Sequence, residues 1–266
     1  MPPLPRQHLK DLAGLARRKG RRALGLFLVE GVRAVEAAVA AGAPLDGVLV
    51  TPEAAEDPRV AAALGAARAP VHVVPAKDLA RVADVQHGQG VVAVARAVVR
   101  EDAAVLDGAR AVLVLDGVQD PGNVGTLIRT AAWFGADAVL CGPGTADPES
   151  PKAARSAAGA LWDLALVRLS APVAYGAALD GLRARGLPLW GADLEGEPAA
   201  AWAPPREGVL VLGSEGHGLS AEAAVRLDGR VRIAARHPVG ADRPRGVESL
   251  NVAVAGGILL HRWLGG

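Results

Sequence analysis

The stretch VLVLDGVQDPGNVGTLIRTAAWFGADAVL, residues 112–140, carries the pattern that decides the fold. A short apolar run ends at Asp116, a loop punctuated by glycine and proline follows, and a helical pattern then leads into a second apolar run. Alternation of apolar strands with helices is typical of a mostly parallel sheet covered on both faces. Ligands of such sheets bind outside the carboxyl ends of the strands. Asn123, in the loop, and Arg129, on the helix, are therefore candidate site residues.

The same alternation continues towards the end of the chain. Strands are expected at residues 111–116, 137–141, 163–168, 187–192, 208–212 and 229–233. Helices are expected at residues 124–135, 151–160, 172–185, 220–227 and 250–263. A smaller α/β unit precedes these elements. Between the two units, a mixed-charge stretch near residues 97–108 interrupts the alternation of strands and helices. We therefore expect two domains, at residues 1–100 and 108–266.

Length and composition agree with two folded domains. The 266 residues are long for one core, and a composition of 51% hydrophobic and 21% charged residues argues against a disordered chain. Cys141 is the single cysteine, so an intrachain disulfide is excluded and a cytoplasmic location is expected. The start lacks the apolar region of a signal peptide, and the apolar stretch at residues 250–264 is too short to cross a bilayer. We expect no membrane partner.

Positive charge is concentrated at the start of the chain, although the net charge is only +1. Residues 1–25 contain one acidic residue, Asp11, against seven basic residues: Arg6, Lys10, Arg17, Arg18, Lys19, Arg21 and Arg22. Such a block attracts phosphate backbones or anionic surfaces. A solvated first helix explains the same residues equally well, so charge alone leaves both interpretations open.

A second candidate loop lies in the stretch GVLVLGSEGHGLS, residues 208–220. An apolar strand runs into Gly213, Gly216 and Gly218, and Glu215 is a carboxylate among these glycines. Three glycines in six residues leave backbone N–H and C=O groups uncovered, as a ligand loop requires. A plain turn would need only one glycine, so the pattern favours a binding loop.

A third candidate lies in GVESLNVAVAGGILL, residues 246–260, where Ser249 and Asn251 stand at the entry to an apolar helix. Glu248 adds favourable negative charge at that end. Helix capping is a complete explanation for either polar residue and for Asn123, and a surface position is sufficient for Arg129. Two polar helix entries and a glycine loop in one half of the chain nevertheless favour a shared site.

Several common sites are excluded by their missing motifs. CGPGTAD, residues 141–147, lacks the third glycine of a dinucleotide fingerprint, and no phosphate loop of the form GxxxxGK[ST] is present. The six histidines show no metal-ligand spacing, so no metal is expected. The nucleophile elbow GxSxG is also absent.

Taken in order, the three loops resemble the three motifs of the SpoU (TrmH-type) RNA ribose methyltransferases of the SPOUT superfamily. The matching segments are DPGNVGTLIRTAAWFGADAVL, VLVLGSEGHGLS and ESLNVAVAGGILL. SPKAARSAAGAL, residues 150–161, also resembles that family. The N-terminal segment ARRKGRRALGLFLVEGVRAVEAAV, residues 16–39, resembles the family's substrate-binding domain, which is related to ribosomal RNA-binding α/β proteins. The resemblance covers nearly the whole chain.

The resemblance implies a deep trefoil knot in the C-terminal domain, a homodimer and S-adenosylmethionine as cofactor. The implied catalytic residues are Asn123, Arg129, Glu215, Ser249 and Asn251. The implied cofactor-binding residues are Leu212, Gly213, Ser214, Gly216, Ile233, Leu250 and Asn251. The implied RNA-binding residues are Arg17, Arg18, Lys19, Arg21, Arg22, Lys152 and Arg155. The chain departs from the family at RIAARHPVGADRPRGVESLN, residues 232–251, which is longer than usual and lacks a proline after Ile233.

The implied reaction is methyl transfer to a ribose 2′-hydroxyl of structured RNA. The separate N-terminal domain favours ribosomal RNA, 23S rRNA in particular, over transfer RNA. A catalytically silent RNA-binding or ribosome-assembly protein with the same fold is the alternative from another class. Retention of Asn123, Arg129, Glu215, Ser249 and Asn251 argues against that alternative.

Overall fold

The computed structural model describes residues 4–83, 89–235 and 249–265. Residues 112–140 fold as the pattern predicts, into strand β5 (Ala111–Asp116), helix α8 (Pro121–Trp133) and strand β6 (Ala138–Cys141). Every residue of β5 and β6 is buried. Near-continuous apolar strands of this kind occur where both faces of a sheet are covered.

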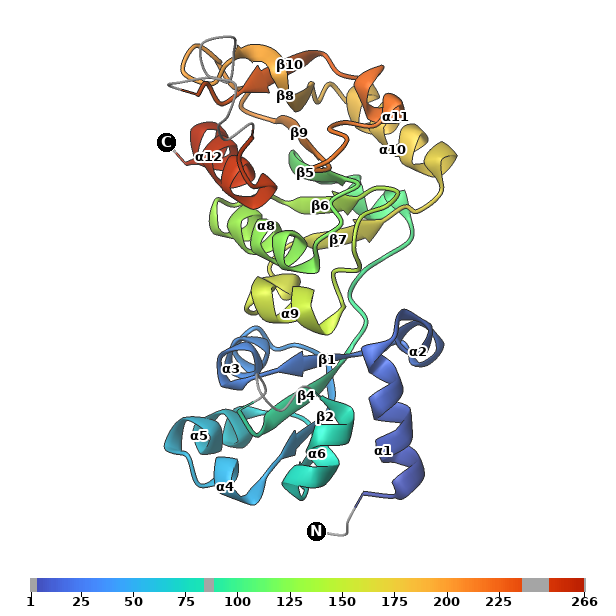
Figure 1. Ribbon diagram of the computed structural model, residues 1–266, viewed down its shortest axis with the longest axis vertical. Helices are drawn as coiled ribbons and strands as arrows, with labels where there is room; N and C mark the ends of the chain where they lie inside the picture. Colours follow the sequence, from blue (N-terminus) through green and yellow to red (C-terminus); the bar gives the residue numbers. More distant parts are fainter. Residues whose placement is uncertain (1–3, 84–88, 236–248, 266) are drawn as a thin grey trace. The chain divides into compact units, whose positions relative to one another are not determined.

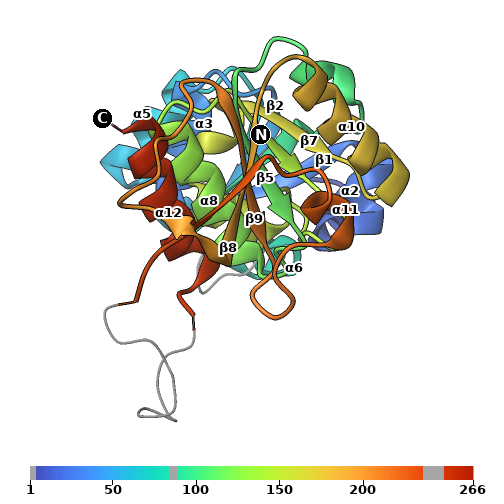
Figure 2. The same ribbon diagram turned by 90° about the horizontal axis from the view of Figure 1, so that it is seen from above.

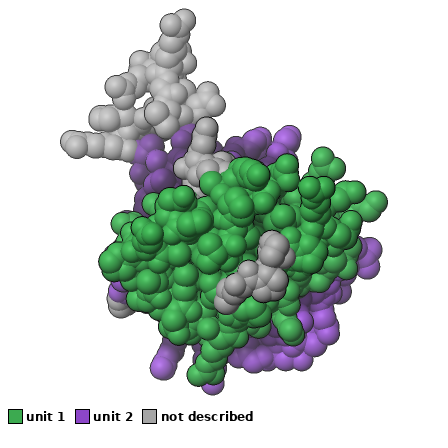
Figure 3. Space-filling view, turned by 90° about the horizontal axis from the view of Figure 1, so that it is seen from below, with its two compact units in different colours: residues 1–99, 147–163 green, residues 100–146, 164–266 purple. Residues whose placement is uncertain are grey.

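The chain divides into two compact units, which are coloured separately in Figure 3. Unit 1 comprises residues 1–99 and 147–163, and unit 2 comprises residues 100–146 and 164–266. Each described unit has one sheet, with four strands in unit 1 and six in unit 2.

Unit 2 contains a six-stranded sheet in the order β10-β8-β9-β5-β6-β7, in which all five neighbouring pairs are parallel (Figure 1). Its other elements are the 3₁₀ helix η2 (Ala103–Leu106), strands β7 (Ala165–Arg168), β8 (Leu189–Pro198), β9 (Gly208–Gly213) and β10 (Gly229–Arg232), and helices α10 (Pro172–Ala184), α11 (Ala221–Ala224) and α12 (Val252–Leu264). These elements confirm the predicted α/β class and parallel sheet. Strand β8 extends beyond its predicted end at residue 192, whereas α11 has only four residues.

Helices cover both faces of the unit 2 sheet. Helices α8 and α12 lie on one face, and α10 and α11 lie on the other (Figure 2). Gly256 lets α12 approach closely, because a Cβ atom there would come within 2.4 Å of Leu127 on α8 and 2.6 Å of Leu212 on β9. The start of α12 is thereby fixed beside the carboxyl end of the sheet.

Unit 1 contains a mixed sheet in the order β1-β4-β2-β3. Strand β4 is antiparallel to both of its neighbours, whereas β2 and β3 are parallel. The strands are β1 (Leu26–Glu30), β2 (Leu45–Val50), β3 (Val71–Val73) and β4 (Val91–Arg96). The helices of residues 1–99 are α1 (Arg6–Ala13), η1 (Gly14–Ala16), α2 (Arg18–Leu24), α3 (Val32–Ala40), α4 (Pro52–Ala55), α5 (Pro58–Ala66) and α6 (Ala76–Val82).

The segment Asp147–Asp163 packs with unit 1, although it connects two strands of unit 2. It contains α9 (Pro151–Ala157) and η3 (Ala160–Trp162). Buried Glu149 accepts hydrogen bonds from the backbone N–H groups of Val98 at 2.7 Å and Val99 at 2.9 Å. Trp162 stacks on Phe27 with ring centroids 6.1 Å apart. The compact units are therefore not continuous in sequence, because this segment of the predicted second domain, 108–266, groups with residues 1–99. The domain boundaries at 1–100 and 108–266 stay a prediction.

The predicted trefoil knot depends on the path of the chain between β10 and α12. That path runs through residues 236–248, which lie outside the described residues. The three arginines of the long loop before the third motif, Arg236, Arg243 and Arg245, and the acidic residue Glu248 belong to this range. None of the described helices is long and apolar enough to span a membrane.

Candidate active site

The three sequence motifs converge at the carboxyl edge of the unit 2 sheet. Strands β5 and β9 are neighbours, and Asp116 at the end of β5 pairs with Gly213 at the end of β9. The loops that follow these two strands must therefore lie side by side. Helix α12 brings the third motif to the same edge through its close packing on α8 and β9.

Asn123 connects all three motifs through its side-chain amide. Its Nδ2 donates to Glu215 Oε1 at 2.6 Å, and its Oδ1 accepts from Asn251 Nδ2 at 3.1 Å. Because a carboxylate only accepts and an amide does both, this order of donors and acceptors satisfies each group. The network fixes the first motif against the glycine loop and against the start of α12.

Asp120, and not Asn123, caps helix α8. Its Oδ1 accepts from the backbone N–H of Asn123 at 3.0 Å, and Pro121 occupies the first helical turn, where proline is favoured. The amide of Asn123 is therefore left for the network. Asn251 both joins the network and caps a helix: its Nδ2 donates to Asn123, and its Oδ1 caps α12 by accepting from Ala253 N at 2.9 Å. Ser249 lies exposed just before this cap.

The glycine loop after β9 is a tight reversal. Ser214 and Gly218 exchange two backbone hydrogen bonds, of 2.9 and 3.0 Å, and Gly218 has a positive φ of 68°. A Cβ atom on Gly213 would lie 2.3 Å from the Gly218 backbone, so only glycine allows this approach. Glu215 is carried at the exposed tip of this reversal.

Hydrogen bonds from Thr145 and Ala146, which the sequence did not predict, hold the loop after β5. Thr145 Oγ1 donates to Leu115 O at 2.6 Å and accepts from Gly117 N at 3.0 Å. Ala146 N donates to Val118 O at 2.9 Å. Threonine in a turn after a strand gives no sequence signal for such long-range bonds. These hydrogen bonds hold the loop between β5 and α8 in one conformation.

Arg129 lies exposed on α8. Within the described part of the chain, its guanidinium forms no hydrogen bond or ion pair with protein groups. Asn123 and Glu215 bond to each other and not to Arg129. The guanidinium is therefore free of protein partners in the described structure and accessible to an external anion.

Residues 110–261 match the model of the SpoU rRNA Methylase family. The chain belongs to the SpoU rRNA methylase family. Residues 6–93 of this SpoU methylase match the model of the MRM3-like substrate binding domain.

Relatives of this SpoU methylase cover nearly its whole length. It is 33% identical, over 260 residues, to the 23S rRNA (guanosine(2553)-2′-O)-methyltransferase RlmP of Bacillus subtilis, with 97% of this chain and 96% of RlmP covered. The crystal structure of AviRb from Streptomyces viridochromogenes with AdoMet superposes with a TM-score of 0.83, at 26% identity and 97% coverage of both chains. An AdoMet-bound rRNA methyltransferase from Sinorhizobium meliloti gives a TM-score of 0.75, at 26% identity, covering 98% of this chain and 95% of that one.

The predicted cofactor residues of this SpoU methylase fit a ligand that is held by backbone groups. Leu212 is buried in β9, whereas Gly213 and Ser214 are partly exposed and Gly216 is exposed. Among the described residues, no protein acceptor is found for the backbone N–H of Ile233 or Leu250. A strand end and a helix entry thus present backbone N–H groups without a partner among the described residues, and the exposed glycine loop lies at the same edge of the sheet.

The predicted RNA-binding residues of this SpoU methylase divide into two groups. Arg17, Arg18, Lys19, Arg22 and Lys152 are exposed. Arg21 is only 5% exposed, and it bonds to Asp147 at 2.6 Å and to the Leu15 and Ala16 carbonyls. Arg155 forms an ion pair with buried Glu30. These two arginines hold segment 147–163 within unit 1 through their ion pairs with Asp147 and buried Glu30. Their predicted contact with RNA stays a prediction.

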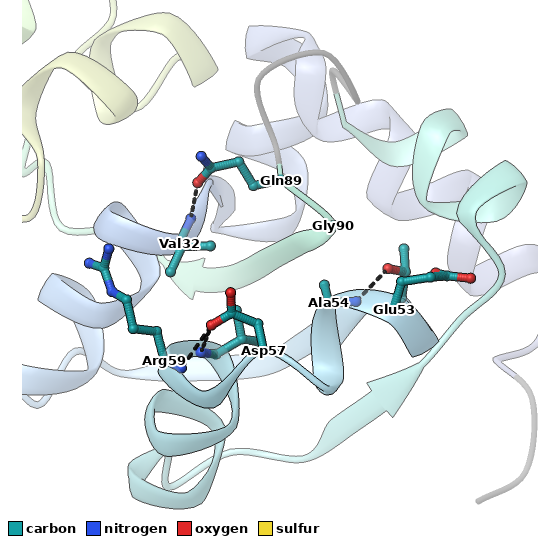
Figure 4. Close-up of a pocket in the computed structure, with 9 residues that line it drawn as sticks. Val32, Glu53, Ala54, Asp57, Arg59, Gln89 and Gly90 are labelled. Atoms are coloured by element: carbon teal, nitrogen blue, oxygen red, sulfur yellow. Dashed lines mark hydrogen bonds between the residues drawn. The ribbon is translucent and has the colours of Figure 1, made fainter.

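Unit 1 of this SpoU methylase also has a cavity of about 480 Å³ that involves none of the predicted site residues (Figure 4). Gln89 Oε1 accepts from Val32 N at 3.3 Å at one side. Asp57 caps α5 by accepting from Arg59 N at 2.8 Å, and the Arg59 guanidinium bonds to Glu36. These polar groups are largely matched within the protein. Within the described ranges, no cluster of three or more His, Cys, Asp or Glu side chains could hold a metal ion.

Proposed function

We propose that this chain catalyses S-adenosylmethionine-dependent methylation of a ribose 2′-hydroxyl in ribosomal RNA, and specifically in 23S rRNA. The Asn123–Glu215–Asn251 network carries the proposal, because it assembles three separate family motifs into one site. The printed names of the relatives support it, since RlmP is a 23S rRNA 2′-O-methyltransferase and AviRb is described with AdoMet bound. An RNA substrate of this kind implies a cytoplasmic enzyme.

S-adenosylmethionine, when bound, supplies a methyl group on a positively charged sulfur. We assign its binding to the edge formed by Leu212, Gly213, Ser214, Gly216, Ile233, Leu250 and Asn251. The backbone N–H groups of Ile233 and Leu250, which have no acceptor among the described residues, are available to bind polar groups of such a molecule. A trefoil knot in the C-terminal domain is part of the proposal.

Arg129 is assigned the substrate phosphate. A ribose hydroxyl is a poor nucleophile until it loses its proton, and reaction requires oxygen, methyl carbon and sulfur in line. A guanidinium has five donors and no acceptor, so it suits the binding of phosphate and the stabilisation of negative charge on oxygen. The exposed position of Arg129 leaves it accessible for both tasks.

The remaining polar residues are assigned to positioning. Glu215 and Asn251 fix the Asn123 amide from two sides, which holds the first motif in one conformation. Ser249 and Asn251 border the site at the entry to α12. The substrate RNA is bound by the exposed cations Arg17, Arg18, Lys19, Arg22 and Lys152 of unit 1.

A homodimer through α12 is part of the proposal. Val254 and Ile258 lie one helical turn apart and are 52% and 42% exposed. Residues four apart share one face of a helix, so they form an apolar stripe on the surface. A second copy of the chain, presenting the same stripe about a twofold axis, would cover it.

The proposal is tested by transfer of radiolabelled methyl groups from S-adenosylmethionine to purified RNA. Domain fragments of 23S rRNA, a 16S rRNA fragment and bulk transfer RNA are compared as substrates, with cofactor binding measured separately by calorimetry. Label in a 23S fragment is the expected result. Label in transfer RNA alone would overturn the substrate assignment, and cofactor binding without any transfer would favour a catalytically silent RNA-binding protein.

A further inference from the structure

We propose that Asp116 is a positioning residue for the cofactor, because it holds both ends of the glycine loop, residues 213–220. The inference rests on the proposed function, since it concerns the same cofactor site. Asp116 pairs through its backbone with Gly213, where the loop begins. Its carboxylate binds Ser220, where the loop ends and α11 starts.

The contact between Asp116 and Ser220 is double. Asp116 Oδ2 accepts from the Ser220 backbone N–H at 2.6 Å, and Oδ1 accepts from the Ser220 hydroxyl at 3.0 Å. Both carboxylate oxygens are therefore used by a single residue that lies 104 positions further along the chain. Ser220 Oγ in turn caps α11 by accepting from Ala223 N at 3.2 Å.

Because Asp116 is buried, its carboxylate keeps its hydrogen bonds only while Ser220 stays at its present position. Asp116 is only 3% exposed, and no cation forms an ion pair with it among the described residues. A buried carboxylate is costly unless hydrogen bonds replace its lost hydration. A displacement of Ser220 would break both hydrogen bonds to Asp116 at once. The end of the glycine loop is therefore held in place relative to the end of β5.

The surroundings of Asp116 support the same conclusion. Tyr175 of α10 is fully buried, and its burial, with a further contribution from the Asp116 charge, raises the pKa of the phenol. A Cβ atom on Gly142 would lie 2.8 Å from the Tyr175 ring, so the ring is packed tightly there. The carboxylate is thus set in a dense layer of the sheet, and the glycine loop projects from it.

The loop needs such an anchor because its own bonds fix only its tip. Ser214 and Gly218 close the reversal with two backbone bonds, while Gly216 meets no atom within 4 Å at its Cβ position. The loop contributes Gly213, Ser214 and Gly216 to the proposed cofactor site and Glu215 to the Asn123 network. Loss of the Asp116 anchor should therefore weaken cofactor binding without a matching effect on RNA binding.

The test is Asp116→Asn in the full-length protein, with Asp137→Asn as matched control. Asp137 also accepts two hydrogen bonds, but both come from backbone N–H groups, of Arg110 at 2.7 Å and Ala111 at 2.8 Å, and it does so from an exposed position at the opposite end of β5. Calorimetry with S-adenosylmethionine should show binding weaker by about tenfold or more for Asp116→Asn and near wild type for Asp137→Asn. Hydrogen–deuterium exchange should rise in peptides spanning 214–220 for the first variant only.

A second pair of variants covers the case in which Asp116→Asn does not fold. Ser220→Ala removes the hydroxyl bond but keeps the N–H bond, and should weaken cofactor binding about threefold. Ser220→Thr keeps both bonds and should bind as wild type. Equal binding and equal exchange for all variants, with the wild type binding cofactor, would overturn the inference. Absence of cofactor binding by the wild type would instead overturn the proposed function.

Discussion

Asn123 donates a hydrogen bond of 2.6 Å to Glu215 Oε1, although 92 residues separate the two along the chain. Together with the 3.1 Å bond from Asn251, it makes one amide the meeting point of three loops. Parallel strands make this possible, because β5 and β9 end at the same edge of the sheet. A hydrogen bond to a charged partner is stronger than one between neutral groups, so the Asn123–Glu215 contact carries most of this connection.

The first prediction concerns Asn123→Ala. The variant loses the bond to the Glu215 carboxylate, worth about 1.5–3 kcal/mol, and the neutral bond from Asn251, worth about 0.5–1.5 kcal/mol, and its methyl-transfer rate should fall about tenfold to a hundredfold. Initial rates at saturating cofactor and RNA measure this effect. Thr126→Ala, at an exposed position on the same helix, is the control and should keep the wild-type rate. Equal rates for the two variants would show that the network has no role in the reaction.

The second prediction separates two neighbouring cations of unit 1. Arg21→Ala removes the ion pair to Asp147, whose side chain is 10% exposed, and should cost about 3–5 kcal/mol of unfolding free energy. Lys19→Glu changes an exposed residue and should leave stability within about 0.5 kcal/mol while weakening RNA binding several-fold. Urea denaturation and filter binding measure the two effects. Loss of RNA affinity by Arg21→Ala at full stability would contradict the structural role of Arg21.

The third prediction uses the fact that Tyr175 is the only tyrosine in the chain. Burial, followed by the Asp116 charge, raises its pKa above the value of about 10 that it would have when unfolded. The phenol therefore favours the folded state below about pH 10, and this contribution is lost as the pH rises through the folded pKa. Absorbance at 295 nm should show no tyrosinate at about pH 10.5 until the protein unfolds. Titration near pH 10 in the folded protein would contradict this environment.

The fourth prediction concerns assembly. Ile258→Glu places a charge on the exposed stripe of α12 and should shift a dimer to a monomer, as measured by light scattering. Val225→Glu, at an exposed apolar residue just after α11, should leave the dimer intact. A wild-type monomer, or a dimer unaffected by Ile258→Glu, would exclude α12 as the interface.

Much of unit 2 follows from the sequence because β5, β6, β7 and β9 are short, mostly apolar and bounded by clear turn signals, whereas the longer and more polar β8 runs past its predicted end. The convergence of the loops around Asn123, Glu215 and Asn251 also follows, since parallel strands end at one edge. The cap of α8 could have been assigned to Asp120 from the proline that follows it, because proline favours the first helical position.

Long-range partners could not be inferred in the same way. Five basic residues stand within positions 17–22, and nothing local shows that Arg21 turns inward, because its partner Asp147 lies 126 residues away. The grouping of segment 147–163 with unit 1 depends on similar distant contacts, including Glu149 with the backbone of Val98. Asp116 reads in sequence as the last residue of a strand, and its bond to Ser220 is visible only in the folded chain.

The central claim is methyl transfer to a ribose hydroxyl with Arg129 holding the substrate. Its most direct test is mass spectrometry of the nucleosides released from 23S rRNA fragments after incubation with S-adenosylmethionine and the protein. The account predicts a 2′-O-methylated nucleoside with the wild type and at least about a hundredfold less with Arg129→Ala, whose stability and cofactor affinity stay at the wild-type level. A methyl group on a base, or an undiminished ribose product from Arg129→Ala, would contradict it.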